Sequence, residues 1–184
     1  MKKYFLIYCG LILICVLSSF VSCTPKDKTP EIKIGVIAEL TGDLPAVGAS
    51  CKNAALLAVD EINAQGGIPF NGVPHRIHLF IEDNAGKAEQ SAAAAQKLIT
   101  RNKVSMIIGP NSTRYVLPAA EIAESSQVPL ITPWSTNPKT TLDARTNEPK
   151  KYVFRACFID PFQGRIVARF ARDHFKAKTA AILY

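Results

Sequence analysis

The chain has 184 residues, with 22 lysines and arginines against 15 aspartates and glutamates, and a formal net charge of +7 at pH 7. The basic residues are scattered and form no block interleaved with aromatic residues, so the composition does not support nucleic-acid binding. Beyond the first 23 residues the cysteines are Cys51 and Cys157, and neither has metal-site spacing. We predict two free, partly buried thiols rather than a disulfide, and no metal or cofactor site.

The first 23 residues have the pattern of a secretory leader. Two lysines precede a long apolar run, and Cys23 is followed at once by the polar sequence TPKDKTPE. The residues FVSC resemble a lipobox, in which the cysteine is lipidated, although Phe20 stands where leucine is usual. The alternative is an uncleaved transmembrane anchor, because the run approaches the roughly 17 residues that can span a bilayer. We expect a lipoprotein signal peptide at 1–22, a tether at 23–31 and an extracytoplasmic chain.

The rest of the chain alternates apolar runs with segments of helical spacing. Strands are predicted at 32–40, 76–83, 104–109, 128–132, 152–158 and 179–184, and helices are predicted after the first, second, third and fifth of them. Gly66-Gly67 is a stop signal for the first of these helices. Near-continuous apolar strands that alternate with helices indicate an α/β fold with an open parallel sheet and helices on both faces.

The third helix raises a question at its start, in the sequence MIIGPNSTRYVLPAA. Pro118 lacks an N–H and would clash inside a helix, so either the helix starts near Leu117 or its first turn is irregular. The polar residues before it have two alternative roles. Asn111, Ser112 or Thr113 caps the helix, or the helix N-terminus binds an anion through its unpaired N–H groups.

Three polar loops are predicted to meet at one edge of the sheet. The sequences ELTGDLPAVGAS, GPNSTR and TPWSTNP follow the first, third and fourth strands, and open parallel sheets bind ligands beyond these strand ends. The loops offer hydroxyl and N–H groups but no nucleophile paired with a base, which favours binding over enzyme activity. We interpret Glu82 and Asp83 as helix-capping or solvated groups, and His75 and His78 as surface or packing residues.

Four segments carry a resemblance to a known family. IKIGVIAELTGDLPAVGASCKNAALLAVDEINAQGGI, IIGPNSTR, PLITPWSTNP and FRACFIDPFQG occur in the order and spacing of the periplasmic leucine/isoleucine/valine-binding proteins of ABC importers. The resemblance implies a periplasmic-binding-protein type I fold, with two α/β lobes joined by a hinge and an amino acid held between them. It makes 32–155 a nearly complete first ligand-binding lobe and 156–184 the start of a truncated second lobe. The chain is therefore expected to be half a binding protein.

The same resemblance implies a set of ligand contacts. Thr113 falls where a hydroxyl and an N–H meet the ligand carboxylate, Thr136 matches a threonine that contacts the amino-acid head group, and Trp134 contributes backbone contacts. Val47 stands where a tyrosine often covers the ligand, so the side-chain pocket is expected to differ in shape. The implied ligand-binding residues are Ser112, Thr113, Trp134, Ser135, Thr136 and Val47.

The function implied is solute binding for an ABC importer. The protein would bind branched-chain or related amino acids and deliver them to permease subunits, as a monomer when full length, held at the membrane through lipid on Cys23. A lipid-anchored ligand-sensing receptor module is an alternative, and urea, short amides or aromatic acids are alternative ligands. An enzyme of flavodoxin-like architecture is disfavoured because the sequence contains neither a phosphate-binding loop nor a dinucleotide fingerprint.

Overall fold

The computed structural model describes residues 29 to 181, so the predicted leader and Cys23 lie outside the described residues. Six strands form one sheet in the order β2-β3-β1-β4-β5-β6. Their bounds are β1 (Glu31–Ala38), β2 (Ile68–Phe70), β3 (Val73–Asp83), β4 (Met106–Ile108), β5 (Leu130–Thr132) and β6 (Val153–Arg155). All neighbouring pairs are parallel except β2 with β3, which confirms the open, parallel α/β sheet.

The edge strand β2 was not predicted, although the sequence contains a signal for it. β2 and β3 form an antiparallel hairpin through Asn71-Gly72, in which Phe70 pairs with Val73. Asn71 and Gly72 have φ angles of 50° and 78°. Asn-Gly tolerates such positive φ angles and is the strongest short-range signal for a two-residue hairpin turn.

The strand order reverses beside β1. Ile34 of β1 pairs with Leu79 of β3 on one side and with Met106 of β4 on the other. The chain therefore passes from β1 to β3 in one direction and then crosses to β4 in the other. This reversal opens a crevice beyond the carboxyl ends of β1 and β4, which is where open parallel sheets bind ligands.

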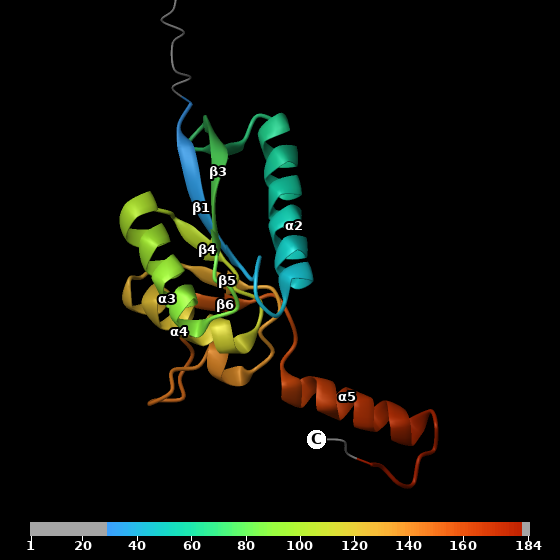
Figure 1. Cartoon of the computed structure of the whole chain (residues 1–184). Helices are drawn as coiled ribbons and strands as arrows, with labels where there is room; N and C mark the ends of the chain where they lie inside the picture. Colours follow the sequence, from blue (N-terminus) through green and yellow to red (C-terminus); the bar gives the residue numbers. More distant parts are fainter. Residues whose placement is uncertain (1–28, 182–184) are drawn as a thin grey trace, which may run out of the picture.

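Helices cover both faces of the sheet. α2 (Pro45–Ala64) lies against β1 and β3 on one face, and α3 (Ala88–Lys97) and α4 (Thr113–Ser125) pack together on the other, as Figure 1 shows. α3 continues into a π-helical turn, η2 (Leu98–Asn102), and a short 3-10 helix, η3 (Pro138–Thr140), follows β5.

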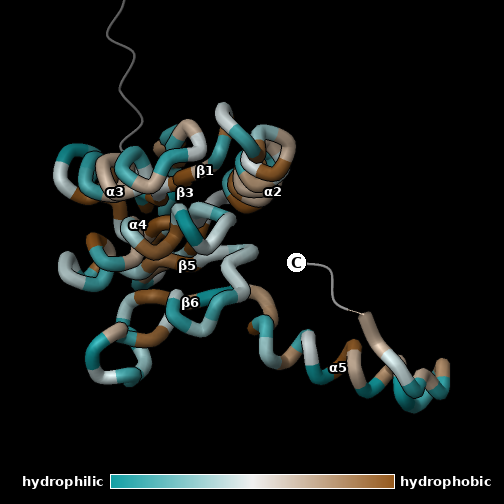
Figure 2. Tube along the Cα trace, turned by 60° about the horizontal axis from the view of Figure 1, so that its bottom comes forward, coloured by the Kyte–Doolittle hydropathy of each residue, from teal (hydrophilic) through white to brown (hydrophobic). Residues whose placement is uncertain are grey.

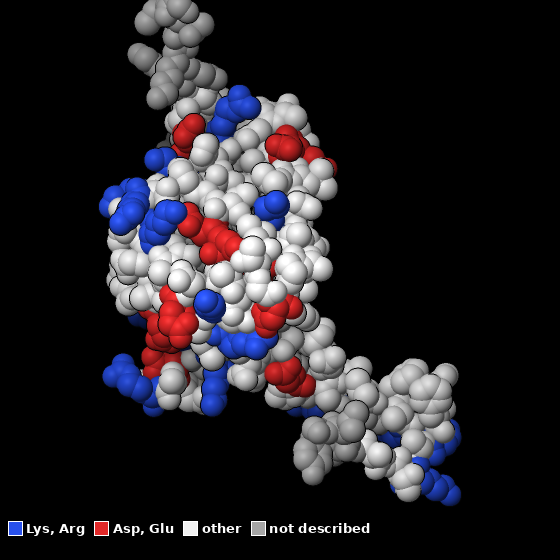
Figure 3. Space-filling view, viewed as in Figure 1, with Lys and Arg blue, Asp and Glu red and all other residues white. Residues whose placement is uncertain are grey.

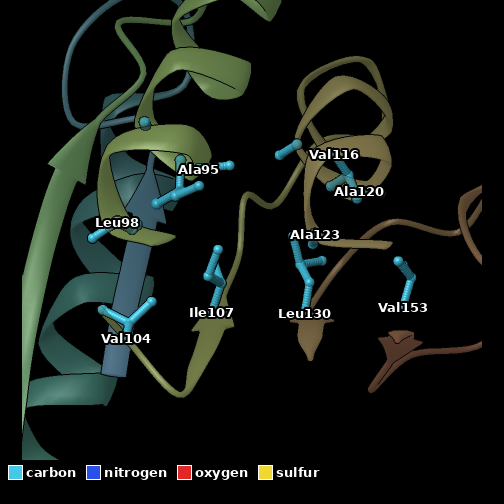
Figure 4. Packing of buried hydrophobic residues seen from close by; sticks show 12 residues of the cluster. Ala95, Leu98, Val104, Ile107, Val116, Ala120, Ala123, Leu130 and Val153 are labelled. Carbon is cyan, nitrogen blue, oxygen red and sulfur yellow. The ribbon is translucent and has the colours of Figure 1, made fainter. Parts of the chain in front are cut away.

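The main core lies between the sheet and the pair α3 and α4. Figure 4 shows Ala95, Val116, Ala120 and Ala123 facing the side chains of the central strands. Small alanines let these helices approach the sheet closely, so the larger strand residues fill the space between. The buried residues of this cluster are Ile37, Ala94, Ala95, Leu98, Val104, Ile107, Val116, Ala119, Ala120, Ala123, Leu130 and Val153.

Helix α4 resolves the question that Pro118 raised. It begins at Thr113 and runs through Pro118, so the prediction of a late start near Leu117 is wrong. The Ser112 carbonyl accepts from the N–H groups of both Tyr115 and Val116, at 2.9 and 3.0 Å, so the first turn combines 3-10 and α-helical bonding. Pro118 is tolerated because it comes directly after this turn and costs the helix a single internal hydrogen bond.

The last helix, α5 (Asp160–Asp173), stands apart from the rest. It projects away from the sheet and its helices in Figures 1 and 2, and none of its residues is buried. Phe162, Ile166 and Phe170 recur at helical spacing and are each about half exposed, at 48%, 45% and 53%. Residues 179 to 181 form no strand, so the described part of the predicted strand at 179–184 is irregular. Within residues 29 to 181 no helix has the length and apolarity that crossing a bilayer requires.

Candidate ligand-binding cleft

The three loops predicted to meet do meet at the carboxyl ends of β1, β4 and β5. Two side-chain contacts join them. Glu39, just after β1, accepts hydrogen bonds from Asn111, just after β4, and Thr113 at the start of α4 bonds to Ser135 in the loop after β5. The site is therefore assembled from segments 22 to 72 residues apart in sequence.

Hydroxyl groups form a row on one side of the crevice. Thr113 Oγ1 lies 2.9 Å from Ser135 Oγ, which lies 2.6 Å from Thr140 Oγ1. Ser135 and Thr140 are fully buried, whereas Thr113 is half-buried at the outer end of the row. A hydroxyl both donates and accepts, so Thr113 can accept from Ser135 and turn its own proton toward a ligand oxygen.

Of the two roles left open for these residues, the helix cap through a side chain is not formed. Ser112 is the N-cap of α4, but its side chain makes no capping hydrogen bond, and the hydroxyl of Thr113 bonds to Ser135. The capping carboxylate comes from Glu39. Its Oε1 accepts from the backbone N–H groups of Asn111 at 3.0 Å and Ser112 at 3.3 Å, and its Oε2 accepts from Asn111 Nδ2 at 2.6 Å. Glu39 therefore holds the turn before α4, while the N–H groups of Thr113 and Arg114 in the first turn of the helix make no hydrogen bond among residues 29 to 181.

Gly48 allows this arrangement on the side of α2. A Cβ atom at Gly48 would lie 2.2 Å from the Glu39 carbonyl oxygen and 2.4 Å from its carbonyl carbon. Both neighbours are backbone atoms and cannot rotate away, so any larger residue would push α2 off the end of β1. The glycine thus fixes how closely the helix approaches the crevice.

The loop after β1 is tied down at two points. Asp83 accepts from the N–H groups of Leu40 and Thr41 and from the Thr41 hydroxyl, the last at 2.6 Å. Partial burial acts to raise the pKa of Asp83, but these bonds and one from the N–H of Ala85 together hold that pKa below its ordinary 3.8. Asp83 is therefore a tie between loops and makes no helix cap, and it is exposed, as the predicted solvated group would be.

Asp43 makes the second tie. It forms an ion pair with Arg114 and accepts a 2.8 Å hydrogen bond from the Tyr115 hydroxyl, both at the start of α4. Burial raises the pKa of Tyr115, and the hydrogen bond to Asp43 adds to the effect. The first loop is thereby held against the same helix whose N-terminus Glu39 caps.

Arg155 holds the loop after β5. From the end of β6 its guanidinium donates to the carbonyls of Ser135 at 2.7 Å and Asn137 at 2.9 Å, and to the Thr141 hydroxyl at 2.7 Å. Burial lowers the pKa of this guanidinium. Neither Arg155 nor Glu39 was predicted from sequence. The available signal was a charged residue at the end of each of two apolar strands whose carboxyl ends lie at the same edge of the sheet.

An apolar cavity of about 650 Å³ lies beside the hydroxyl row, between α2 and the strand ends. Val47 is among the residues that line it, whereas Ser112, Thr113 and Thr136 are not. The lining residues Asn111 and Pro133 each lie two positions before a member of the hydroxyl row, Thr113 and Ser135. Trp134 is 49% exposed and also lies outside it. The lining residues are Ala46, Val47, Ser50, Cys51, Ala54, Ala55, Ile108, Asn111 and Pro133.

No charged residue is among those that line the cavity. The two predicted free thiols are confirmed, and each is partly buried. Burial raises the pKa of Cys51, and the nearby charge of Glu39 raises it further. A hydrogen bond with Asn111 has the opposite effect but is weaker, so this thiol contributes to the cavity wall as a neutral group. Figure 3 shows acidic and basic side chains interspersed over one face of the molecule, with no single basic patch there.

The fold is that of a periplasmic binding protein. The model of the family described as "Periplasmic binding protein" matches residues 31–184, and the chain belongs to that family. The Leu/Ile/Val-binding protein BraC3 of Rhizobium johnstonii is 34% identical over 153 residues, which cover 83% of this chain and 39% of that protein.

Solved structures agree with this assignment. The branched-chain amino acid transporter substrate-binding protein LivJ of Streptococcus pneumoniae, in complex with isoleucine, is 35% identical with a TM-score of 0.70, over 80% of this chain and 40% of that one. A solute-binding protein of an ABC transporter from Rhodopseudomonas palustris, in complex with 3,4-dihydroxybenzoic acid, is 26% identical with a TM-score of 0.65. The match covers 77% of this chain and 36% of that one. This chain thus spans about 40% of the length of these relatives.

Proposed function

We propose that this chain is part of an extracytoplasmic solute-binding lipoprotein of an ABC importer, which binds branched-chain or related amino acids for delivery to a permease. The observation that carries the proposal is the half-buried Thr113 hydroxyl, which is held by Ser135 and lies two residues along the chain from Asn111, a lining residue of the apolar cavity. Hydroxyl donors beside an apolar pocket fit a carboxylate that carries a hydrocarbon side chain.

In this proposal the carboxylate accepts hydrogen bonds from Thr113 and Thr136. Thr136 is half-buried, and its side chain makes no hydrogen bond among residues 29 to 181. Trp134 contributes its backbone, and Val47 and the cavity receive the apolar side chain. A carboxylate leaving water needs such charge-assisted bonds to offset its lost hydration.

We also propose the domain division implied by the resemblance, with a first lobe at 32–155 and the beginning of a second at 156–184. Proteins that close two lobes over a ligand exclude water from it, and a ligand held by one lobe stays half solvated. The 184-residue chain alone should therefore bind amino acids weakly, in the millimolar range, and not at micromolar affinity.

Aromatic acids are a second class of ligand. The Rhodopseudomonas relative was solved with 3,4-dihydroxybenzoic acid. In this chain Val47 leaves more room at the cavity mouth than a tyrosine would, and an aromatic ring could use that room. Both ligand classes carry a carboxylate, so both are expected to need the threonine hydroxyls.

An NMR titration of the isotope-labelled chain tests the proposal. Leucine should shift the amide signals of Thr113 and Thr136, and Thr113→Ala or Thr136→Ala should weaken binding roughly ten- to hundredfold, because bonds to charged groups contribute about 1.5 to 3 kcal/mol. Thr100→Ala is the control, since its hydroxyl bonds only to the Gln96 carbonyl within its own helix. If leucine, isoleucine, valine and 3,4-dihydroxybenzoate leave every signal unmoved, the proposed function is wrong.

The anchor is tested separately. Cys23 lies outside the described residues, and its lipidation rests on the FVSC sequence alone. In a bacterium that processes lipoproteins, the wild type should partition into membranes and Cys23→Ala should lose its lipid. Stable anchoring needs more than one acyl chain, so the change should be large. A Cys23→Ala protein with the wild-type mass, apart from the substituted atoms, would indicate a transmembrane anchor.

A further inference from the structure

Glu39 is a fully buried carboxylate for which the proposed binding mechanism has no role. Burying an ionised carboxylate is costly unless hydrogen bonds replace its hydration. Its partners are all N–H groups of Asn111 and Ser112, and within residues 29 to 181 no lysine or arginine forms an ion pair with it. A buried carboxylate whose hydrogen-bond donors are all neutral suggests that it fixes the position of those donors and does more than fill space in the core.

The constraint acts on the turn that presents Thr113. Asn111 and Ser112 are the two residues before it, and Glu39 holds both by their backbone N–H groups. Asn111 also lines the apolar cavity, so one residue joins Glu39 to the cavity wall and to the hydroxyl row. The backbone of Glu39 is itself in close contact with α2 at Gly48, so the turn is held by a residue packed between β1 and α2.

We infer that Glu39 is a positioning residue for ligand binding: its carboxylate fixes the Asn111–Ser112 turn so that the Thr113 hydroxyl faces the ligand. It takes only the N–H groups of Asn111 and Ser112, so the hydroxyl and the backbone N–H of Thr113 both stay available to the ligand's carboxylate. This inference rests on the proposed function only for what the ligand is. The placement of the turn stands on the contacts of Glu39 alone.

The sharpest test exchanges the charge within the pair. In Asn111→Asp two buried carboxylates face each other, so leucine affinity should fall at least about tenfold, as expected when a charge-assisted hydrogen bond is lost. Adding Glu39→Gln restores a donor facing an acceptor, because the introduced amide can donate to the introduced carboxylate while its oxygen still accepts the backbone N–H groups. The double variant should therefore bind better than Asn111→Asp alone, although Glu39→Gln by itself weakens binding.

Glu124→Gln is the matched control. Glu124 also accepts two backbone N–H bonds, from Lys151 at 2.9 Å and Tyr152 at 2.8 Å, but it does so before β6, at the opposite end of the strands. The Glu124→Gln variant should lower the melting temperature, as Glu39→Gln does, but it should leave the affinity for leucine unchanged. If both glutamine variants lose stability alike and neither changes affinity, Glu39 is only structural and the inference is wrong.

The ligand-free spectrum keeps the test independent of the proposed function. Glu39→Gln should shift the Thr113 and Ser135 amide signals and speed hydrogen exchange at Asn111 and Ser112 at least about tenfold, as for a lost local hydrogen bond. These measurements also decide the inference if Asn111→Asp does not fold. Unchanged signals in Glu39→Gln would overturn the positioning role whether or not leucine binds, whereas a wild type that ignores every ligand would overturn only the proposed function.

Discussion

Helices α4 and α5 have similar lengths, 13 and 14 residues, and both carry an apolar stripe, yet their surroundings are opposite. α4 buries five residues against the sheet and α3, while no residue of α5 is buried. Helical periodicity thus predicts that a stripe exists, but whether the stripe is buried depends on what the fold places opposite it. In Figure 2 no other helix or strand of residues 29 to 181 lies against α5, and the ring of Phe170 contacts that of Phe175 just beyond the end of the helix.

Their N-termini differ in the same way. α4 is capped by Glu39, which lies 72 residues from Asn111 in sequence. α5 begins with local signals, a proline in its first turn and Asp160 near the positive end of its dipole. One helix is therefore fixed by tertiary contacts and the other by its own residues.

The largest expected difference comes from placing the same charge in both stripes. Val116→Asp buries an unpaired carboxylate in the core and should cost more than about 4 kcal/mol of unfolding free energy, enough to unfold the chain. Ile166→Asp in α5 should change stability by less than about 0.5 kcal/mol, because isoleucine and aspartate differ little in helix propensity and the site is exposed. Urea unfolding measures both. Similar losses would mean that α5 is buried in solution.

Glycine-to-alanine changes should give opposite signs. Gly48→Ala drives a Cβ into the Glu39 backbone and should destabilise the chain by about 1 to 3 kcal/mol, as overpacking does. Nothing lies within 4 Å of a Cβ at Gly164 in α5, so Gly164→Ala should stabilise by about 0.5 to 1 kcal/mol through helix propensity. Thermal unfolding of the two variants provides the comparison, and two changes of the same sign would contradict the close approach at Gly48.

Acidification should have a smaller effect, which distinguishes the loop after β1 from α5. The pKa of Asp83 is held below its ordinary 3.8, so its ionised form stabilises the folded chain above that pH, and the contribution is lost as pH falls through the lower folded-state value. Solvent exposure keeps the effect modest. Amide signals of Leu40 and Thr41 should therefore move below about pH 4 while the backbone signals of α5 change less. In Asp83→Asn the amide signals of Leu40 and Thr41 should already be shifted at neutral pH. If these signals in the variant still moved below about pH 4, Asp83 would be excluded as the cause.

Much of the fold could be predicted because it depends on local patterns. The apolar strands, the intervening helices and the parallel sheet follow from periodicity and from glycines such as Gly66-Gly67. The segments quoted for the family resemblance also located the loops that meet at the rim. The Asn71-Gly72 hairpin was equally local, and its strand was missed because a three-residue strand carries little periodicity of its own.

The tertiary structure alone decided what holds the turn before α4 and what stays exposed. The sequence left a helix cap and an anion site open at this turn and did not predict Glu39, which reaches the turn only because the reversal of strand order sets β1 beside β4. Likewise, Arg155 reaches the loop after β5 only because β6 pairs with β5. Local pattern determines which segments become strands and helices, whereas the partner of a buried charge depends on which strand ends become neighbours, and no local pattern contains that information.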